Sequence, residues 1–179
     1  MYHVGEYVIK ASQGVCRIED ILPLNLPYGK KDRLYYLLIP REDAKAKIYV
    51  PVDSEHSDLR KAMDEKEAWD IIEKLPDMQE DWIANDKQRE QKYKEVIKGG
   101  RPEELACMIK NLYQHKKKRN ALGKRNGTVD EHLFQVATDH LFSEMAFVIG
   151  KDKGEIHHLI EENARKKQAT KKAQTASEV

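Results

Sequence analysis

The first fifty or so residues carry apolar positions in the pattern of short β-strands. β-branched and aromatic residues cluster in four runs, and turn-forming stretches such as "SQG" and "PLNLPYGKKD" separate these runs. The predicted strands are Tyr2–Lys10, Gly14–Ile21, Arg33–Pro40 and Lys45–Val52. Four short strands in so little chain favour antiparallel pairing, and therefore a small curled sheet or barrel with an exposed edge strand.

From Asp53 onward the apolar positions recur every three or four residues, which predicts helices. The stretch "SDLRKAM" at 57–63 is predicted as a turn or a short helix. The following stretch, "DEKEAWDIIEKLP", places Trp69 on the apolar stripe of a helix that ends at Pro76. We therefore expect Trp69 to be a core residue.

Three or four more helices are predicted in the second half of the chain. The stretch Asn85–Lys98 forms the first, and Pro102 opens the next at a position where its missing N–H is tolerated. Thr128 with Glu131 is expected to form the capping box of a long helix. The chain after Arg165 is polar, which predicts a frayed or disordered tail.

These elements together predict an α+β fold in which a small antiparallel β-barrel precedes an all-helical domain. The β-barrel is expected over residues 1–53, and connecting helices are expected over 54–76. The helical domain is expected over 77–165, and the disordered tail over 166–179.

The sequence carries no signature of a catalytic or cofactor site. The glycines form neither a dinucleotide-binding nor a phosphate-binding loop, and the nucleophile elbow of serine hydrolases is missing. His140 and Glu144 lie four residues apart on a predicted helix, but two ligands are too few for a metal site. Cys16 and Cys107 match no metal-binding spacing. We therefore expect no enzymatic activity, no metal and no cofactor.

The composition points to a cytoplasmic protein without a membrane span, because there is no long apolar run and no signal-peptide pattern at the N-terminus. Lys and Arg number 32 and Asp and Glu number 31, so only their distribution carries information. Basic residues gather at 116–119, and Lys87, Lys94 and Lys98 fall near one side of a predicted helix. Acidic residues are interleaved, so a soluble mixed-charge helix and a weak, salt-sensitive phosphate-binding surface both stay open.

Trp82 stands apart from both neighbouring helices in a stretch of polar chain. Two interpretations follow from the residues alone. The indole is either pinned at a domain junction, or presented to a ligand in the way that apolar side chains wedge into a DNA minor groove.

Several segments, in this order, resemble the CarD/CdnL family of bacterial transcription regulators. They lie between Tyr2 and Gly150 and include "HVGEYVIKASQGVCRIEDI", "YYLLIP", "KIYVPVD", "LACMIKNLYQHKKKR" and "DEHLFQVATDHLFSEMAFVIG". The N-terminal module is similar to the RNA-polymerase-interacting domain of the transcription-repair coupling factor.

The resemblance implies a Tudor-like barrel that docks on the RNA polymerase β subunit. It also implies a helical domain that lies on promoter DNA at the upstream edge of the transcription bubble and stabilises the open complex, with little sequence specificity and no cofactor. Trp82 matches the family's inserting Trp. The expected DNA-contacting residues are Trp82, Arg89, Lys94, Lys87 and Lys116, and the expected polymerase-contacting residues are Lys47 and Tyr49.

We expect a monomer that associates with the nucleoid through RNA polymerase. A second hypothesis of another class stays open, in which the chain is a protein–protein adaptor of the transcription machinery without direct DNA contact.

Overall fold

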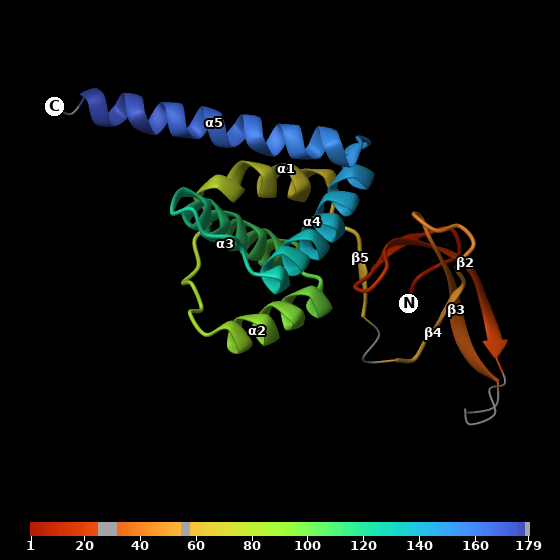
Figure 1. The fold of residues 1–179 in the computed structure, drawn as a ribbon. Coiled ribbons are helices and arrows are strands. Elements are labelled where there is room, and N and C mark those ends of the chain that lie inside the picture. The colour runs from red at the N-terminus through yellow and green to blue at the C-terminus, as the bar shows by residue number, and fades with distance from the viewer. Residues whose placement is uncertain (25–31, 55–57, 178–179) are drawn as a thin grey trace. The chain divides into compact units, whose positions relative to one another are not determined.

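The structure is a computed structural model that describes residues 1–24, 32–54 and 58–177. The chain divides into two compact units, Met1–Ala62 and Met63–Val179 (Figure 1). The predicted boundary at residue 53 falls earlier than this division. A fifth strand, which the sequence pattern did not predict, carries the first unit to Ala62.

The first unit is an antiparallel sheet built from short strands with one apolar face. The strands are β1 (Tyr7–Lys10), β2 (Gly14–Leu24), β3 (Arg33–Pro40), β4 (Ile48–Pro51) and β5 (Leu59–Lys61). Their order in the sheet is β4-β3-β2-β1-β5, so β4 and β5 are the edges of the described sheet. The side chains that form its core are Val8, Cys16, Ile18, Tyr36, Leu38 and Val50.

The expectation of a turn or short helix at 57–63 was wrong for the described part of that stretch. Residues 58–63 contain β5, whose three residues pair with β1. Three residues are too few to show a period, so this strand is fixed by pairing with its neighbour rather than by local pattern. Ser57 and most of the predicted turn "PLNLPYGKKD" lie outside the described residues.

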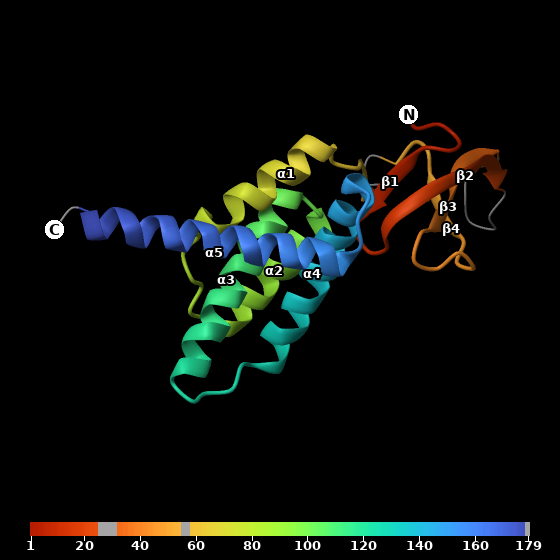
Figure 2. The same ribbon diagram turned by 90° about the horizontal axis from the view of Figure 1, so that it is seen from above.

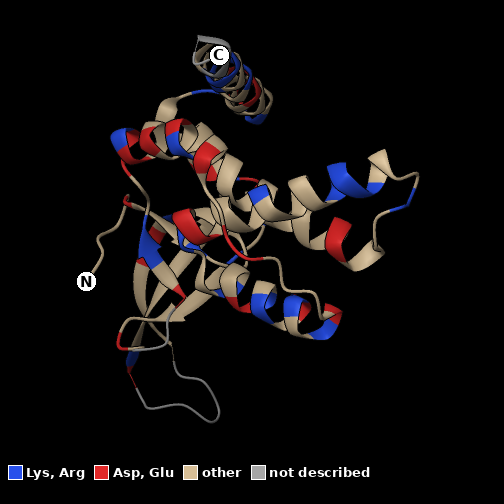
Figure 3. Cartoon of the chain, turned by 90° about the vertical axis from the view of Figure 1, so that its left-hand side faces the viewer, with Lys and Arg blue, Asp and Glu red and all other residues tan. Residues whose placement is uncertain are grey.

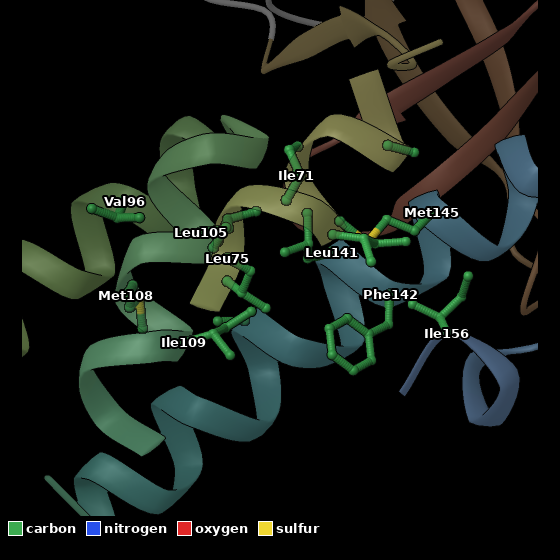
Figure 4. Close-up of a cluster of buried hydrophobic side chains, with 14 of the residues drawn as sticks. Ile71, Leu75, Val96, Leu105, Met108, Ile109, Leu141, Phe142, Met145 and Ile156 are labelled. Atoms are coloured by element: carbon green, nitrogen blue, oxygen red, sulfur yellow. The ribbon is translucent and has the colours of Figure 1, made fainter. Parts of the chain in front are cut away.

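The second unit is all-helical, so the predicted order of a β module followed by a helical domain is confirmed (Figure 2). Its elements are α1 (Glu65–Lys74), the 3-10 turn η1 (Leu75–Asp77), α2 (Asp86–Gly99), α3 (Pro102–Ala121), α4 (Thr128–Ile149) and α5 (Lys153–Ser177). Apolar side chains from all five helices and η1 meet in one core (Figure 4). Leu105, Met108, Leu141 and Met145 are among its fully buried members.

Local signals at the helix ends were predicted in part. Pro102 occupies the first turn of α3, and Gly100 ends α2 in the left-handed conformation that favours glycine. The predicted capping box at α4 was wrong, because Thr128 is already helical and, within the described chain, no side chain caps this helix. Glu131 instead accepts hydrogen bonds from Lys116 and Asn126.

Trp69 and the tail also differ from their predictions. Trp69 is 39% exposed, and its indole N–H donates to Glu65 on the same solvent-facing side of α1. The expected disordered tail is helical as far as Ser177. Lys167 and Lys171 bond to Asp77 at the end of η1, which gives this polar stretch a partner that local pattern cannot show.

Candidate nucleic-acid interface

Trp82 lies in residues 78–85, which the structure describes in full and which form neither helix nor strand. The side chain is half-buried and packs against the edge of the helical core. The imidazole of His115 stacks on the indole, with ring centroids 3.7 Å apart and an interplanar angle of 16°. The guanidinium carbon of Arg89 lies 4.4 Å from the ring centroid. The indole is therefore held at the surface by side chains from α2 and α3.

Arg89 is buried beneath this site and makes four hydrogen bonds within the protein. Its Nε and Nη2 donate to the two carboxylate oxygens of Asp130 at 3.1 and 2.9 Å. Nη2 also donates to Asp86, and Nη1 donates to the carbonyl oxygen of Ile83, both at 2.9 Å. Burial disfavours the cation, but the bonds to Asp130 and Asp86 outweigh it and raise the pKa of Arg89 above its ordinary value.

This placement gives Arg89 partners within the protein, and its expected contact with a DNA phosphate stays a prediction. Arg89 is 5% exposed, and four of its five N–H groups are used in bonds to two carboxylates and a carbonyl, so little of its hydrogen-bonding capacity is left for a ligand. Its bond to the carbonyl oxygen of Ile83 fixes the backbone directly after Trp82. Arg89 therefore positions the indole.

His115 is in a state that suits stacking. Burial lowers the pKa of His115 below its ordinary value, and Arg89 lowers it further, whereas Asp130 opposes this shift. This shift favours the neutral form of the ring. A neutral imidazole parallel to an indole makes a close aromatic contact without carrying a buried charge.

Of the predicted lysines, Lys87 lines a cleft together with His115 and Arg89 of this site. Its side chain is exposed, and Arg119 and Asp130 also line this cleft of about 240 Å³. Lys94 is exposed on α2 but bonded to Glu90 at 2.6 Å. Lys87, Lys94 and Lys98 do share one side of α2, as the helical spacing predicts.

Lys116 is half-buried and lies on α3. Its Nζ is 2.8 Å from Glu131 and 5.9 Å from the ring centroid of Phe134. Lys94 is therefore paired with Glu90, and Lys116 is paired with Glu131. These pairs lower the net positive charge of the predicted DNA-contacting residues.

Two residues of the site, His115 and Asp130, were not predicted, and Arg119 was named only as part of the basic run at 116–119. His115 and Arg119 are four residues apart on α3, so they share a face, and that spacing is the one available signal. Asp130 is buried in the first turn of α4, where the helix dipole favours an acid. Its pairing with Arg89 spans 41 residues and has no local signature.

The predicted polymerase-contacting residues lie in the β module. Lys47 is exposed just before β4, and Tyr49 is 45% exposed on β4, an edge of the described sheet. Tyr49 is paired with Leu37 of β3 across the sheet. An edge strand with an exposed aromatic residue can accept a partner by strand addition.

Each half of the chain matches a known family model. Residues 2–63 match the CarD-like/TRCF RID domain, and residues 70–161 match the CarD C-terminal domain. Together the matches define a transcription regulator that interacts with RNA polymerase, with a Tudor-like N-terminal domain. The chain belongs to the CarD family. A search of the curated proteins found no significant match.

The family domains point to a transcription factor rather than an enzyme. Across residues 1–24, 32–54 and 58–177, no group of three His, Cys, Asp or Glu side chains is arranged to hold a metal ion. Within the same described ranges, every helix is too short or too polar to cross a membrane.

Proposed function

We propose that the helical unit contacts promoter DNA at the upstream edge of the transcription bubble while the β module binds the polymerase β subunit, and that the open complex is thereby stabilised. The observation that carries this proposal is the placement of Trp82. Its ring reaches the surface and is held by His115 and Arg89 before any ligand arrives. An apolar ring fixed in advance loses little conformational entropy when it meets a distorted base step.

The stabilisation follows from differential binding. Promoter opening separates and unstacks base pairs, and a protein that binds the opened form more tightly shifts the equilibrium toward it by the ratio of the two affinities. A wedge is favourable only where the step is already deformed, as at the edge of a bubble. His115 stacks on Trp82 and the guanidinium of Arg89 lies over the same ring, so the part of the indole that these two side chains leave uncovered is what meets DNA.

The charges near Trp82 suit weak contact with the DNA backbone. Lys87 and Arg119 line the cleft beside the indole, while Lys94 and Lys116 each share their charge with a carboxylate. Few phosphates are met, so affinity for free DNA is low and falls with salt. Tethering through polymerase raises the local concentration of the helical unit, so weak contacts suffice.

The deciding experiment compares Trp82→Ala with Trp69→Ala in open-complex lifetime assays. Trp69 is a matched control, because it is an exposed tryptophan of the same unit that lies on α1. We expect Trp82→Ala to shorten the lifetime and Trp69→Ala to leave it near the wild-type value. Equal lifetimes for the wild type and a folded Trp82→Ala variant would refute the wedge.

The adaptor hypothesis is tested by footprinting on polymerase–promoter complexes. A DNA-contacting helical unit adds protection upstream of the bubble, and this protection weakens in Trp82→Ala. An adaptor that never touches DNA adds none.

For the β module, we propose that Lys47 and Tyr49 contact polymerase through the β4 edge. The test is capture of the full chain by the polymerase β subunit. Tyr7 is a suitable control for Tyr49, because it is 42% exposed but lies on β1, an interior strand of the sheet. Tyr49→Ala should weaken capture by the polymerase β subunit, and Tyr7→Ala should not. If the two variants are captured equally well, Tyr49 is not part of the interface.

A further inference from the structure

The second half of α5 carries basic residues without interleaved acidic residues, which distinguishes it from α2. Between Asn163 and Ala176 the sequence holds five Lys or Arg residues and no acid, whereas the lysines of α2 alternate with glutamates. The family match ends at residue 161, so this basic half lies outside the region that the family description covers. Its C-terminal end projects beyond the other helices of this unit in both ribbon views (Figures 1 and 2).

Asp77 fixes this half of α5 in place. Its two carboxylate oxygens lie 2.6 Å from the Nζ of Lys167 and 2.8 Å from the Nζ of Lys171. Lys167 also donates to the carbonyl oxygen of Glu73, and Asn163 donates to that of Ile72. The exposed cations of α5 are therefore presented on a braced helix rather than on a loose tail.

Two lysines of α3, Lys110 and Lys117, belong to the same basic group as the cations of α5. Lys110 donates to the carbonyl oxygen of Pro76, next to Asp77. Burial lowers the pKa of Lys110 below its ordinary value; Asp77 raises it, and the positive charges of Lys171 and Lys117 lower it further. Lys117 follows Lys110 by seven residues on α3, so the two lysines share a side of that helix.

Two further cations of this basic group lie on the exposed side of α5. Arg165 and Lys172 are seven residues apart, so they share a side of the helix, and both are exposed. Figure 3 looks along the C-terminal end of α5 and shows Lys and Arg along it. We define the α5 basic surface as Lys110, Lys117, Arg165, Lys171 and Lys172.

We propose that the α5 basic surface is a second phosphate-binding surface for DNA, separate from Trp82. This inference rests on the proposed function, because it takes the helical unit to lie on DNA. Lys171 is held by the Asp77 carboxylate, and the like charges of the five side chains repel one another, so an approaching phosphate backbone is bound through counterion release. No base-reading pattern is needed, so the contact is independent of sequence.

The chain limits where this contact falls on DNA. Asp77 and Trp82 are five residues apart, and an extended chain spans at most about 3.6 Å per residue, or about 18 Å in all. With the reach of long side chains, the phosphates bound by the α5 basic surface lie within about one helical turn of duplex, roughly 34 Å, from the step that meets the indole. The footprint on DNA should therefore extend no more than about one helical turn, roughly 34 Å, from the base step that meets the indole.

The test uses the full chain and a fluorescently labelled forked DNA duplex, with binding measured by anisotropy over a range of salt concentrations. The triple variant Lys117→Gln, Arg165→Gln and Lys172→Gln removes charge without touching the residues that bond to Asp77. The control variant Lys66→Gln, Lys151→Gln and Lys153→Gln removes the same charge from exposed positions elsewhere in the unit.

We expect the triple variant to bind more weakly and to show a slope of log affinity against log salt that is shallower by roughly 2.7, about 0.9 for each of three phosphates. The control variant should keep the wild-type slope. Equal slopes for both variants would overturn the proposal. So would loss of binding to polymerase in the absence of DNA, which would assign the surface to an acidic protein partner.

The two proposals fail separately. Open-complex lifetime of Trp82→Ala tests the wedge, and the salt slope of the triple variant tests the α5 basic surface. A normal slope in the triple variant together with a shortened lifetime in Trp82→Ala would remove this inference and leave the proposed function standing.

Discussion

The imidazole of His115 lies almost parallel to the indole of Trp82, with centroids 3.7 Å apart and planes inclined by 16°. The two rings come from different elements, α3 and the segment before α2, and are 33 residues apart in the chain. Arg89 lies on the same indole at 4.4 Å. Trp82, which the sequence leaves isolated in polar chain, is therefore held in place by two side chains that lie over its ring.

Removing the stack should loosen Trp82. We expect His115→Ala to shorten the open-complex lifetime, but less than Trp82→Ala does, because the indole is still present and Arg89 still contacts it. An aromatic pair of this kind contributes roughly 0.5–1.5 kcal/mol. His132, which is exposed on α4, gives the control substitution His132→Ala. Identical lifetimes in the two His variants would show that the stack does not position Trp82.

The stack should also respond to acid. The pKa of His115 is lowered by burial, so the folded protein holds this ring neutral below the pH at which an unfolded His, with a pKa near 6.5, takes up a proton. As pH falls below about 6.5 the unfolded state binds more protons, so folding stability decreases, and protonation of folded His115 follows at lower pH. Tryptophan fluorescence of a Trp69→Phe background reports Trp82 alone. Its intensity should change with pH in that background and stay flat over the same range when His115→Ala is added.

The sequence predicted the elements better than it predicted the site. β3 matches its predicted span, because a dense β-branched and aromatic run is a local property. Trp69 was misplaced because the apolar stripe of a single helix does not say which of its edges another helix covers; α1 buries Ala68, Ile71 and Ile72 instead. Arg89 was expected to contact DNA because of the family resemblance, and its pairing with Asp130 was not foreseen because a buried ion pair that spans 41 residues leaves no pattern in the sequence.

The Arg89–Asp130 pair should matter more for stability than its neighbour Asp86 does. The side chains of Arg89 and Asp130 are 6% and 9% exposed, whereas that of Asp86 is 89% exposed. Asp130→Asn leaves a buried guanidinium without its main counter-charge, and we expect a loss of about 3 kcal/mol in the free energy of unfolding. Asp86→Asn should cost under about 1 kcal/mol. Chemical denaturation measures both, and equal losses would contradict the structural role of the buried pair.

The contact between Asp77 and α5 should hold at all but strongly acidic pH. The side-chain bonds from Lys167 and then Lys171 lower the pKa of Asp77 to about 2, from an ordinary value near 4. A carboxylate with a lowered pKa stabilises the folded state above the unfolded pKa, and this stabilisation is lost as pH falls from about 4 toward 2. Docking of α5 is therefore independent of pH in the neutral range.

Asp77→Asn should release the second half of α5 at neutral pH, because an amide cannot hold two ammonium groups in place of the carboxylate. Hydrogen exchange should become faster over residues 164–174 and stay unchanged in α3 and α4, whose core does not depend on Asp77. Glu162→Gln is the control, because it breaks an ion pair with Lys166 inside α5 without touching η1. If exchange in α5 is as slow in Asp77→Asn as in Glu162→Gln, the helix is held by its other contacts, such as the bonds of Asn163 and Lys167 to the carbonyl oxygens of Ile72 and Glu73, and the carboxylate at the end of η1 only neutralises charge.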